Sequence, residues 1–468
     1  MKELVKEGGH ESLSCLHHKA HAAVGFYGSP FEEATIITTD GGGDGEWLTV
    51  SHGSKGEDIV QISSSQMDLG GLYQIGGRMC EEIYESYDLS IAGKAMGIMA
   101  GGELDMDVVN AFVYLWDNHM LAKANKLRDV KTTLEGWKEY YQDPKWKDHI
   151  DIIFGSAGID PNNPRYFRGL EQNNLMTNVQ KAFEILFDKT VDRYVDPKLP
   201  IVLSGGCALN VVNNERLKSK WKRPIYVPPC PGDEGLALGV ILEYHKPENQ
   251  IRLHDICPEL YDELNDDGSY EVNDLRKKYT QVLQSTEIDN QGIIDLLHDG
   301  KVIGYIQGPS EFGPRALGFR SILCDPTDPE MKDKINHKIK HREWFRPFAP
   351  LCRAEKATKY FDSENFNNME YMSFAPMVKE EMLDVIPAVV HKDRSSRLQT
   401  VTRDSNRAMY DLLGLWDKDV LLNTSFNIYG RPIVNTINEA LWILLESELD
   451  AVVINNRLFV AEKRTNSE

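Results

Sequence analysis

The sequence has few cysteines and no pairing pattern among them. Seven cysteines are spread over 468 residues, and none forms a Cys-x-x-Cys pair. An odd count without such pairs argues against a disulfide framework. A chain of this length does not need disulfide bonds to stabilise its core, so the composition predicts reduced thiols and a cytoplasmic protein.

Long apolar runs and a signal-peptide core are also lacking. No run reaches the roughly 18 apolar residues that a membrane span requires, and the opening residues MKELVKEGGHESLS are polar. We therefore expect no membrane association and no secretion signal. The sequence also shows no internal repeat, no Walker A motif and no complete GxGxxG motif.

Positive charge is in deficit. Lysine and arginine number 52 against 72 aspartates and glutamates, which gives a net charge of −20. This balance argues against a broad surface for nucleic acid or anionic lipid. A small anionic substrate stays possible, because a local cluster of arginines sets the electrostatic potential of its own pocket.

The pattern of hydrophobic residues predicts an α/β protein with more than one domain. A single core rarely grows beyond about 250–300 residues, and strand and helix patterns alternate along this chain. We expect a first α/β domain over 1–255, a polar, acidic connection over 256–285 and a smaller α/β domain over 286–468. The expected strands are 34–40, 200–206, 224–229, 301–308, 420–426 and 451–456, and the expected helices include 103–125, 174–194 and 437–448.

Two histidines indicate a metal site. His17 and His21 are four residues apart, so on a helix their side chains share one face with Cβ atoms about 6 Å apart. Two imidazoles at this spacing can bind one borderline metal ion. A helix surface that is merely rich in histidine gives the same pattern.

Two aspartates are candidates for the same site, and each has a structural alternative. Asp40 ends an apolar strand and starts a glycine-rich turn, where a carboxylate can face a cleft. Aspartate is also a common turn residue. Asp233 lies just before a predicted helix, a position that fits an N-terminal cap equally well.

Two glycine-rich loops can approach an anion. Asp40–Gly45 lies between two strands, and Ser204-Gly205-Gly206 lies between a strand and a helix. Glycine permits the backbone geometry that turns N–H groups toward an anion, and a helix N-terminus favours phosphate. For the first loop, a tight hairpin is the alternative explanation.

Two segments of the second half concentrate basic residues. Residues 308–321 carry Arg315 and Arg320 among glycines and prolines, and residues 340–350 mix basic residues with aromatics and prolines. Guanidinium groups hold phosphate through paired hydrogen bonds, so we expect an anion pocket here. Ion pairing with the many carboxylates is one alternative. Single-stranded nucleic acid is another, disfavoured by the net charge.

The order of the motifs resembles that of the NodU/CmcH-type carbamoyltransferases along nearly the whole chain. GPRALG and REWFRPFAP are the most specific of them, and HxxxH and the glycine loops are less so. The shared segments are HHKAHAA, TTDGGGDGEW, AGKAMGIMAGG, SGGCALN, PGDEGLALG, GPSEFGPRALGFRSIL, KHREWFRPFAP, RLQTV and NTSFN.

This resemblance implies a fold and an activity. The first domain is expected to be an actin-like ATPase domain similar to the tRNA threonylcarbamoyl-transfer domain. The second is expected to make carbamoyl-adenylate from carbamoyl phosphate and ATP. The carbamoyl group would then pass to a hydroxyl of a small-molecule or sugar acceptor.

The resemblance also implies site residues. His17, His21, Asp40 and Asp233 correspond to the ligands of an iron-type divalent metal, and His18 is a further candidate for the general base. The implied nucleotide contacts of the first domain are Asp40, Gly42, Gly43, Asp44, Lys94, Ser204, Gly205, Gly206 and Asn210. In the second domain Arg315, Arg320, Lys340, Arg346 and Arg397 are the implied catalytic residues, with Asn423 as a further nucleotide contact.

The chain departs from the family pattern in two places. Only sixteen residues precede His17, where the family has a longer segment with the opening strands of the first domain. We expect that segment to be lacking or supplied by a partner chain or a second copy in a homodimer. Arg431 also stands where the family has glutamate.

Three other functions compete with this one. A tRNA threonylcarbamoyl transferase shares the first domain but not the GPRALG signature. A hydrogenase maturation carbamoyltransferase would carry Cys-x-x-Cys zinc motifs, which this sequence lacks. An inactive or split subunit of a carbamoyltransferase would explain the short opening segment.

Overall fold

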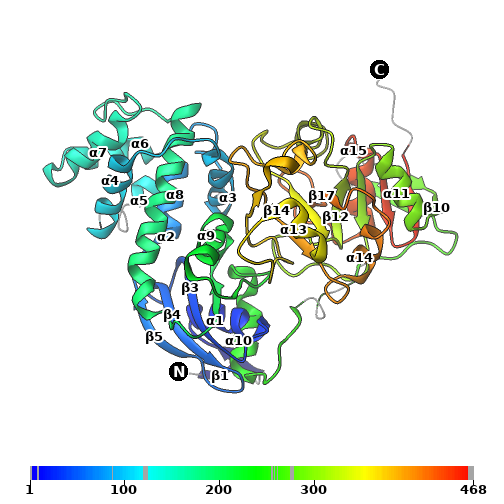
Figure 1. The fold of residues 1–468 in the computed structure, drawn as a ribbon, viewed down its shortest axis with the longest axis horizontal. Helices are drawn as coiled ribbons and strands as arrows, with labels where there is room; N and C mark the ends of the chain where they lie inside the picture. The colour runs from blue at the N-terminus through cyan, green and yellow to red at the C-terminus, as the bar shows by residue number, and fades with distance from the viewer. Residues whose placement is uncertain are drawn as a thin grey trace. The chain divides into compact units, whose positions relative to one another are not determined.

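The chain folds into two compact units, Met1–Ile251 and Arg252–Glu468 (Figure 1). The computed structural model describes residues 3–7, 10–86, 88–119, 125–253, 257, 259–260, 262–274 and 279–461. Both units combine helices with a β-sheet, as the sequence predicts for an α/β protein.

Unit 1 is built on a five-stranded sheet in the order β5-β4-β3-β6-β7. Strands β3, β4 and β5 form an antiparallel meander, and β6 and β7 continue the sheet parallel to β3. The central strands are rich in buried Ile, Val and Thr, which suits a covered sheet. Their bounds are β3 Glu33–Gly43, β4 Glu46–Ser54, β5 Val60–Ser65, β6 Ile201–Ser204 and β7 Ile225–Tyr226.

Two helices cover one face of this sheet in succession. Helix α1 (His17–Gly28) packs on β3 and β6, and α10 (Leu236–His245) packs on α1. The absence of a side chain at Gly239 lets the two helices approach closely, because a Cβ there would lie 2.2 Å from the carbonyl oxygen of Ala20. Buried alanines and glycines of α1 therefore fix how deeply that helix lies in the unit.

A group of helices forms the rest of unit 1. Figure 1 shows α2 and α8 running from the sheet toward α4, α6 and α7, and α2 packs against both α3 and α8. The glycines of α2 (LGGLYQIGGR) obscure its helical periodicity, and sequence analysis missed it together with α3, α6 and α7. These helices are α2 Leu69–Arg78, α3 Asp88–Met99, α4 Met106–Asp117, α5 Asn125–Arg128, α6 Thr133–Tyr141, α7 Pro144–Gly155 and α8 Leu170–Val191.

Unit 2 is built on an eight-stranded mixed sheet in the order β10-β19-β18-β11-β12-β17-β13-β16. Helices α11 (Asn290–His298) and α14 (Arg407–Leu413) contribute to its main hydrophobic core. The strand bounds are β10 Ser285–Glu287, β11 Ile303–Ile306, β12 Arg320–Cys324, β13 Ala349–Arg353, β16 Gln399–Val401, β17 Val420–Ser425, β18 Ala451–Ile454 and β19 Arg457–Phe459.

The expected connection over 256–285 contributes packed structure to unit 2. Strands β8 (Tyr270–Asp274) and β9 (Tyr279–Leu283) form a hairpin, and β8 packs on α15 (Ile437–Glu446). Both carboxylate oxygens of Asp262 accept backbone N–H groups at the start of α15, at 2.6 and 3.2 Å. Because these contacts join residues distant in sequence, a polar segment that resembles a linker belongs to the folded unit.

Every predicted strand and helix has a counterpart in the structure, most with shorter bounds, whereas β3 and α8 are longer than predicted. The predicted helix over 103–125 ends at Asp117 in α4, and residues 120–124 of that prediction lie outside the described residues. The helix predicted to follow Ser204-Gly205-Gly206 is α9 (Val211–Trp221), preceded by the 3-10 turn η3 (Gly206–Leu209). Hydrogen bonds at the caps decide these ends, and hydrophobic periodicity does not register them.

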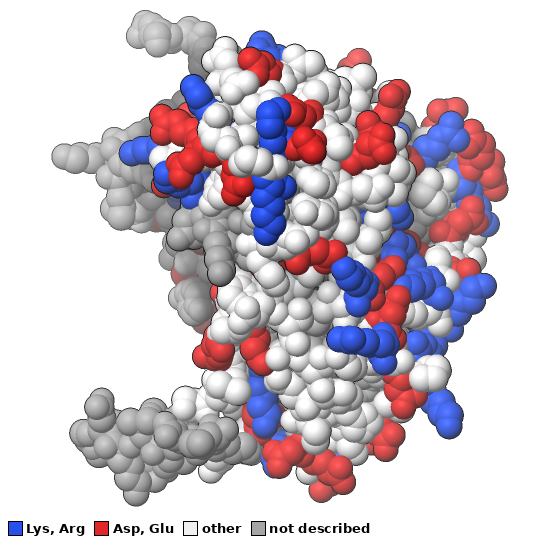
Figure 2. Space-filling model, turned by 90° about the vertical axis from the view of Figure 1, so that its left-hand side faces the viewer, with Lys and Arg blue, Asp and Glu red and all other residues white. Residues whose placement is uncertain are grey.

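No helix in the described ranges is both long and apolar enough to cross a membrane. Figure 2 shows one face of the molecule on which acidic and basic side chains lie interspersed with uncharged ones. Such a mixed face differs from the continuous basic stripe typical of nucleic-acid-binding surfaces.

We predict that Gly239→Ala destabilises unit 1. The added Cβ would overlap the Ala20 carbonyl, so α10 must move away from α1 at a cost of about 1–3 kcal/mol. The measurement is the denaturant midpoint followed by circular dichroism. Gly93→Ala is the matched control, because nothing lies within 4 Å of its Cβ position in α3. Equal midpoints for the two variants would contradict the packing explanation.

Candidate metal and anion sites

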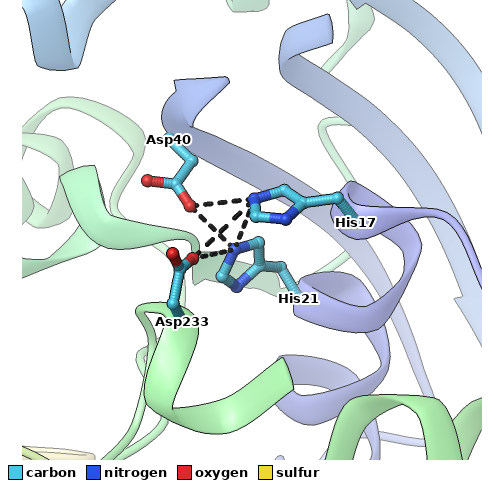
Figure 3. Close-up of side chains that lie close together, drawn as sticks. All are labelled: His17, His21, Asp40 and Asp233. Atoms are coloured by element: carbon cyan, nitrogen blue, oxygen red, sulfur yellow. Dashed lines mark hydrogen bonds and ion pairs between the residues drawn. The ribbon is translucent and has the colours of Figure 1, made fainter. Parts of the chain in front are cut away.

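Four side chains converge in unit 1, as Figure 3 shows. His17, His21, Asp40 and Asp233 each offer one ligand atom, and these atoms all lie within 4.8 Å of one another. The Nε2 atoms of His17 and His21 lie 3.1 and 2.8 Å from Oδ2 of Asp40. The same two nitrogens lie 3.8 and 3.5 Å from Oδ1 of Asp233. The four residues singled out from the sequence are thus brought together by the fold.

The start of α1 places the two histidines. Leu16 occupies the N-cap position without a side-chain hydrogen bond, and the His17 N–H instead donates to Oδ2 of Asp44 at 2.6 Å. This carboxylate satisfies a donor that the helix leaves open. The ring of His17 lies directly beside Gly43, since a Cβ at Gly43 would be 2.3 Å from its Cγ. Gly43 therefore provides the space for the ring.

Asp40 lies where β3 departs from its regular pairing with β4. The register shifts between Thr39 and Gly43, and such an irregularity redirects a side chain that would otherwise follow the pleat. One carboxylate oxygen accepts the Gly41 N–H at 2.7 Å, and the other faces both histidines. Asp40 is therefore a strand residue rather than a residue of the hairpin turn.

Asp233 comes from the loop before α10. It begins the 3-10 turn η4 (Asp233–Gly235), where Gly232 is the N-cap residue and no side chain caps the turn. The Gly205 N–H donates to the Pro231 carbonyl at 2.7 Å, which ties this loop to the end of β6. The Asp233 carboxylate faces the histidines and does not cap the helix. The N-terminal cap, which the sequence left open as an alternative, is therefore not its role in the structure.

The electrostatics of the cluster fit a cation. Burial raises the pKa of Asp40, but hydrogen bonds and charge from His21, the Gly41 N–H and His17 outweigh it and hold that pKa below its usual range. Partial burial, followed by the negative charge of Asp40, raises the pKa of Asp233. Two carboxylates and two imidazoles at this separation form a donor set suited to a borderline divalent metal, and a cation there would offset the repulsion between the carboxylates.

His18 is held inside the fold. Its Nδ1 lies 2.7 Å from Oγ1 of Thr38, and its Nε2 lies 3.1 Å from the Glu46 carbonyl oxygen. Burial lowers the pKa of His18. With both ring nitrogens engaged, this histidine supports the sheet and is poorly placed to act as a base.

Several predicted nucleotide contacts have structural roles. Asp44 caps α1, and Gly42, at a positive φ of 120°, lies beside the Trp47 indole. Gly205 also has a positive φ, of 86°, and its Cβ position lies against the Thr39 carbonyl oxygen, 2.3 Å away. Gly206 lies next to Asp40, because a Cβ there would be 2.9 Å from Oδ1. The glycines therefore allow the loops around Asp40 to pack closely.

The remaining predicted contacts of unit 1 are engaged or buried. Asn210 caps α9 by accepting the Asn213 N–H at 3.0 Å, and its amide donates to Gln180. Lys94 donates to the hydroxyl of Ser86 at 3.0 Å. The buried hydroxyl of Ser204 has no hydrogen-bond partner among the described residues.

Unit 2 brings arginines from three separate segments close together. Burial lowers the pKa of Arg397 well below its usual range, and the charges of Arg315, Arg342 and Arg346 lower it further. Burial likewise lowers the pKa of Lys340, with added repulsion from Arg342 and Arg346. Sequence analysis quoted Arg342 within its motif but did not select it as a site residue. In a chain of net charge −20, such a concentration of cations indicates an anion site.

The segment that carries Arg342 and Arg346 is fixed by a buried amide. The Asn336 side chain donates to the carbonyls of Trp344 and Arg346 at 3.2 and 3.1 Å and accepts from Arg342 Nε at 2.7 Å. Asn336 lies in a π-helical turn (Ile335–Ile339), a feature frequent at functional sites. Sequence analysis missed this residue because its role depends on backbone groups eight and ten residues away.

Three predicted residues of unit 2 are engaged by neighbouring groups. Lys340 donates to the Ser425 carbonyl, the Ser425 hydroxyl and Oδ1 of Asn427, at 2.6, 3.0 and 2.6 Å. Arg320 is fully buried and donates through Nη1 to the Phe319 carbonyl, while its Nε and Nη2 find no partner within the described chain. Asn423, also buried, donates to the Ala316 carbonyl at 3.0 Å.

The carbonyl of Arg431, the second departure from the family pattern, accepts a hydrogen bond from the Asn427 side-chain amide at 2.7 Å. The Arg431 guanidinium stacks on the Trp442 ring at 4.1 Å. The two residues border a cavity of about 210 Å³, which is also lined by Pro432, Val434, Glu439 and Ile443.

Comparison with known proteins identifies the family. The profile for the carbamoyltransferase N-terminus matches residues 3–242, and the profile for the carbamoyltransferase C-terminus matches residues 294–461. The chain belongs to the carbamoyltransferase family. The N-terminal match contains all four residues of the metal cluster, and the C-terminal match contains the arginine cluster.

Nodulation proteins are among the similar sequences. Nodulation protein NolNO of Sinorhizobium fredii is 31% identical over 472 residues, which cover 96% of this chain and 64% of that protein. Nodulation protein NolO of Bradyrhizobium diazoefficiens is 31% identical over 480 residues, 96% of this chain and 79% of that protein. Nodulation protein U of Rhizobium tropici is 28% identical over 395 residues, 81% of this chain and 62% of that protein. The chain therefore spans about two thirds to four fifths of these relatives' own lengths.

We predict that Gly43→Ala weakens metal binding without unfolding unit 1. The added Cβ would displace the His17 ring, and loss of one well-placed ligand is expected to lower the affinity for a divalent metal about tenfold or more. Isothermal titration with Fe²⁺ or Mn²⁺ under anaerobic conditions measures the effect. Gly41→Ala is the control, because nothing lies within 4 Å of its Cβ position. Equal affinities for the two variants would contradict the assignment of His17 as a ligand.

Proposed function

We propose that this protein is an O-carbamoyltransferase that makes carbamoyl-adenylate in unit 2 and transfers the carbamoyl group at the metal site of unit 1. The cluster of Arg315, Arg342, Arg346 and Arg397 carries this proposal. Mutual repulsion and burial make such a cluster costly without a bound anion, and carbamoyl phosphate and ATP are the anions that the family's chemistry uses.

The chemistry of unit 2 joins two anions. Carbamoyl phosphate and water give carbamate and phosphate, and a carbamate oxygen then attacks the α-phosphorus of ATP. The bond from that phosphorus to the bridging oxygen breaks, pyrophosphate leaves, and carbamoyl-adenylate forms. The arginines offset the charges of both reactants and align them, which are the two contributions that such a step requires.

The architecture of unit 1 supports an actin-like ATPase domain. In chain order its sheet reads third, second, first, fourth and fifth strand, with an antiparallel meander followed by two parallel strands, an arrangement that actin-like domains share. The loops at Asp40–Gly45, Gly205–Gly206 and Gly232–Asp233 lie side by side around the metal cluster. We infer that the adenylate is used here.

In this proposal, the transfer of the carbamoyl group takes place at the metal site. His17, His21, Asp40 and Asp233 would hold an iron-type divalent cation. Such an ion polarises a carbonyl or lowers the pKa of a hydroxyl. The acceptor oxygen attacks the carbamoyl carbon and gives its proton to a base or to water. The bond from that carbon to the phosphate oxygen of the adenylate breaks, and AMP leaves. We propose a small molecule or a sugar as the acceptor, with the reaction taking place in the cytoplasm.

We predict that Arg346→Ala and His17→Ala separate the two half-reactions. Arg346→Ala should lower the formation of carbamoyl-adenylate about 10²–10³-fold, because it removes a charge directed at the reacting anions. His17→Ala should lower metal content and carbamoyl transfer and leave adenylate formation largely intact. The measurement follows AMP and pyrophosphate from labelled ATP with carbamoyl phosphate present.

Arg407→Ala is the control for Arg346→Ala, because Arg407 lies on the exposed surface of α14 with 73% of its side chain accessible. This variant should keep the wild-type rate. If the unaltered protein releases neither AMP nor pyrophosphate with a divalent metal present, the adenylation proposal is wrong. If His17→Ala keeps its full metal content, the ligand assignment fails instead.

A further inference from the structure

The loop that carries Arg315 and Arg320 is closed around one carboxylate. Oε1 of Glu311 accepts three backbone N–H groups, from Leu317 at 2.8 Å, Phe319 at 3.0 Å and Arg320 at 2.9 Å. The remaining N–H of this stretch, at Gly318, donates to the Ser321 hydroxyl at 3.0 Å. A single carboxylate oxygen thus fixes residues 317–320, the second half of the loop.

Two backbone carbonyl groups of the same loop accept hydrogen bonds from side-chain amides. The Ala316 carbonyl accepts from the Asn423 amide at 3.0 Å, and the Leu317 carbonyl accepts from the Gln399 amide at 2.9 Å. The Asn423 amide also donates to the Gln399 side chain at 2.7 Å. In the residues that follow Arg315, backbone N–H groups and backbone carbonyl groups are therefore both held by hydrogen bonds.

The carboxylate of Glu311 is deeply buried. Its second oxygen has no hydrogen-bond partner in the described parts of the chain, and neither do Nε and Nη2 of Arg320. Negative charge at Glu311 acts favourably on the Arg320 guanidinium. Burial raises the pKa of Glu311, and the hydrogen bonds from the N–H groups of Arg320, Leu317 and Phe319 oppose that rise. The charged form of a buried glutamate is costly, so these hydrogen bonds and the nearby guanidinium must offset that cost.

We propose that Glu311 is a positioning residue, which holds the 311–320 loop in the conformation that directs Arg315 into the arginine cluster. The inference rests on the proposed function, in which that cluster binds carbamoyl phosphate and ATP. The charge of Arg315 lowers the pKa of Arg397. The loop that fixes Arg315 therefore also sets the distribution of positive charge that the substrate meets. Glu311 itself is engaged with the backbone and touches no substrate.

The charge of Glu311 should matter as well as its shape. Glutamine has the same length and can accept from the same N–H groups, but its bonds are weaker without the negative charge. Its amide nitrogen would also replace a buried oxygen. Glu311→Gln should therefore loosen the loop partly, and Glu311→Ala should release it.

The first test measures the rate of amide hydrogen exchange in peptides that span 315–321 of the full chain. Wild type should be protected, Glu311→Gln should exchange faster, and Glu311→Ala should exchange about tenfold to a hundredfold faster. Glu330→Ala is the control, because this exposed glutamate at the start of α12 (Met331–Lys334) makes no side-chain cap. Unchanged exchange in Glu311→Ala would overturn the proposal whether or not the protein forms AMP.

The second test connects the loop to catalysis through a double-mutant cycle. Glu311→Gln should raise the KM for carbamoyl phosphate about tenfold with a smaller change in kcat. In an Arg315→Ala background the same substitution should add little, because Glu311 acts through Arg315. If the effects of Glu311→Gln and Arg315→Ala on KM multiply in the double variant, the positioning role is overturned. The same holds if Glu311→Gln speeds exchange of the loop but leaves the KM unchanged. A wild-type protein that forms no AMP would instead refute the proposed function.

Discussion

The packing of α1 against β3 is the contact on which the metal cluster depends. It places two imidazoles one helical turn apart over the point where β3 leaves its regular pairing, so that Asp40 faces both of them. Gly43 makes this approach possible and Gly239 lets α10 pack closely on α1, because a side chain at either position would collide with α1. Asp44 then fixes where the helix begins. The site follows from close backbone approach, and its glycines serve packing as much as ligand access.

Unit 2 meets a different constraint, which is the repulsion among buried cations. Arg315, Arg342, Arg346 and Arg397 lie close enough to lower one another's proton affinity or that of Lys340. Isolated side chains would move apart. Here two of the three arginine-bearing segments are held by a buried polar residue, Glu311 for the loop of Arg315 and Asn336 for the segment of Arg342 and Arg346. Rigid loops keep the charges together and leave a strongly positive site for an anion to occupy.

Sequence reasoning succeeded where chemistry is local. The four-residue spacing of the histidines, the aspartate that ends a strand and the arginines within glycine- and proline-rich segments could all be predicted, and the fold brings most of them together. Sequence reasoning also assigned ligand contacts to Lys94, Asn210 and Lys340, which stay predictions; in the structure their side chains contact Ser86, Asn213 and Ser425. It also missed α2 and the packed hairpin within the expected connection, because glycines and polar residues hide their contacts.

The sequence by itself determined the α/β character and the family, and it singled out the candidate metal-binding and arginine residues, since spacing along the chain and residue type carry that information. Only the tertiary structure decided their roles. Whether Asp233 caps a helix or faces the two histidines, whether Asp44 contacts the start of α1, and whether Glu311 is a surface carboxylate or the centre of a loop all depend on atoms far apart in sequence. Hydrogen bonds across the fold select one partner for each side chain, and no local pattern records that choice.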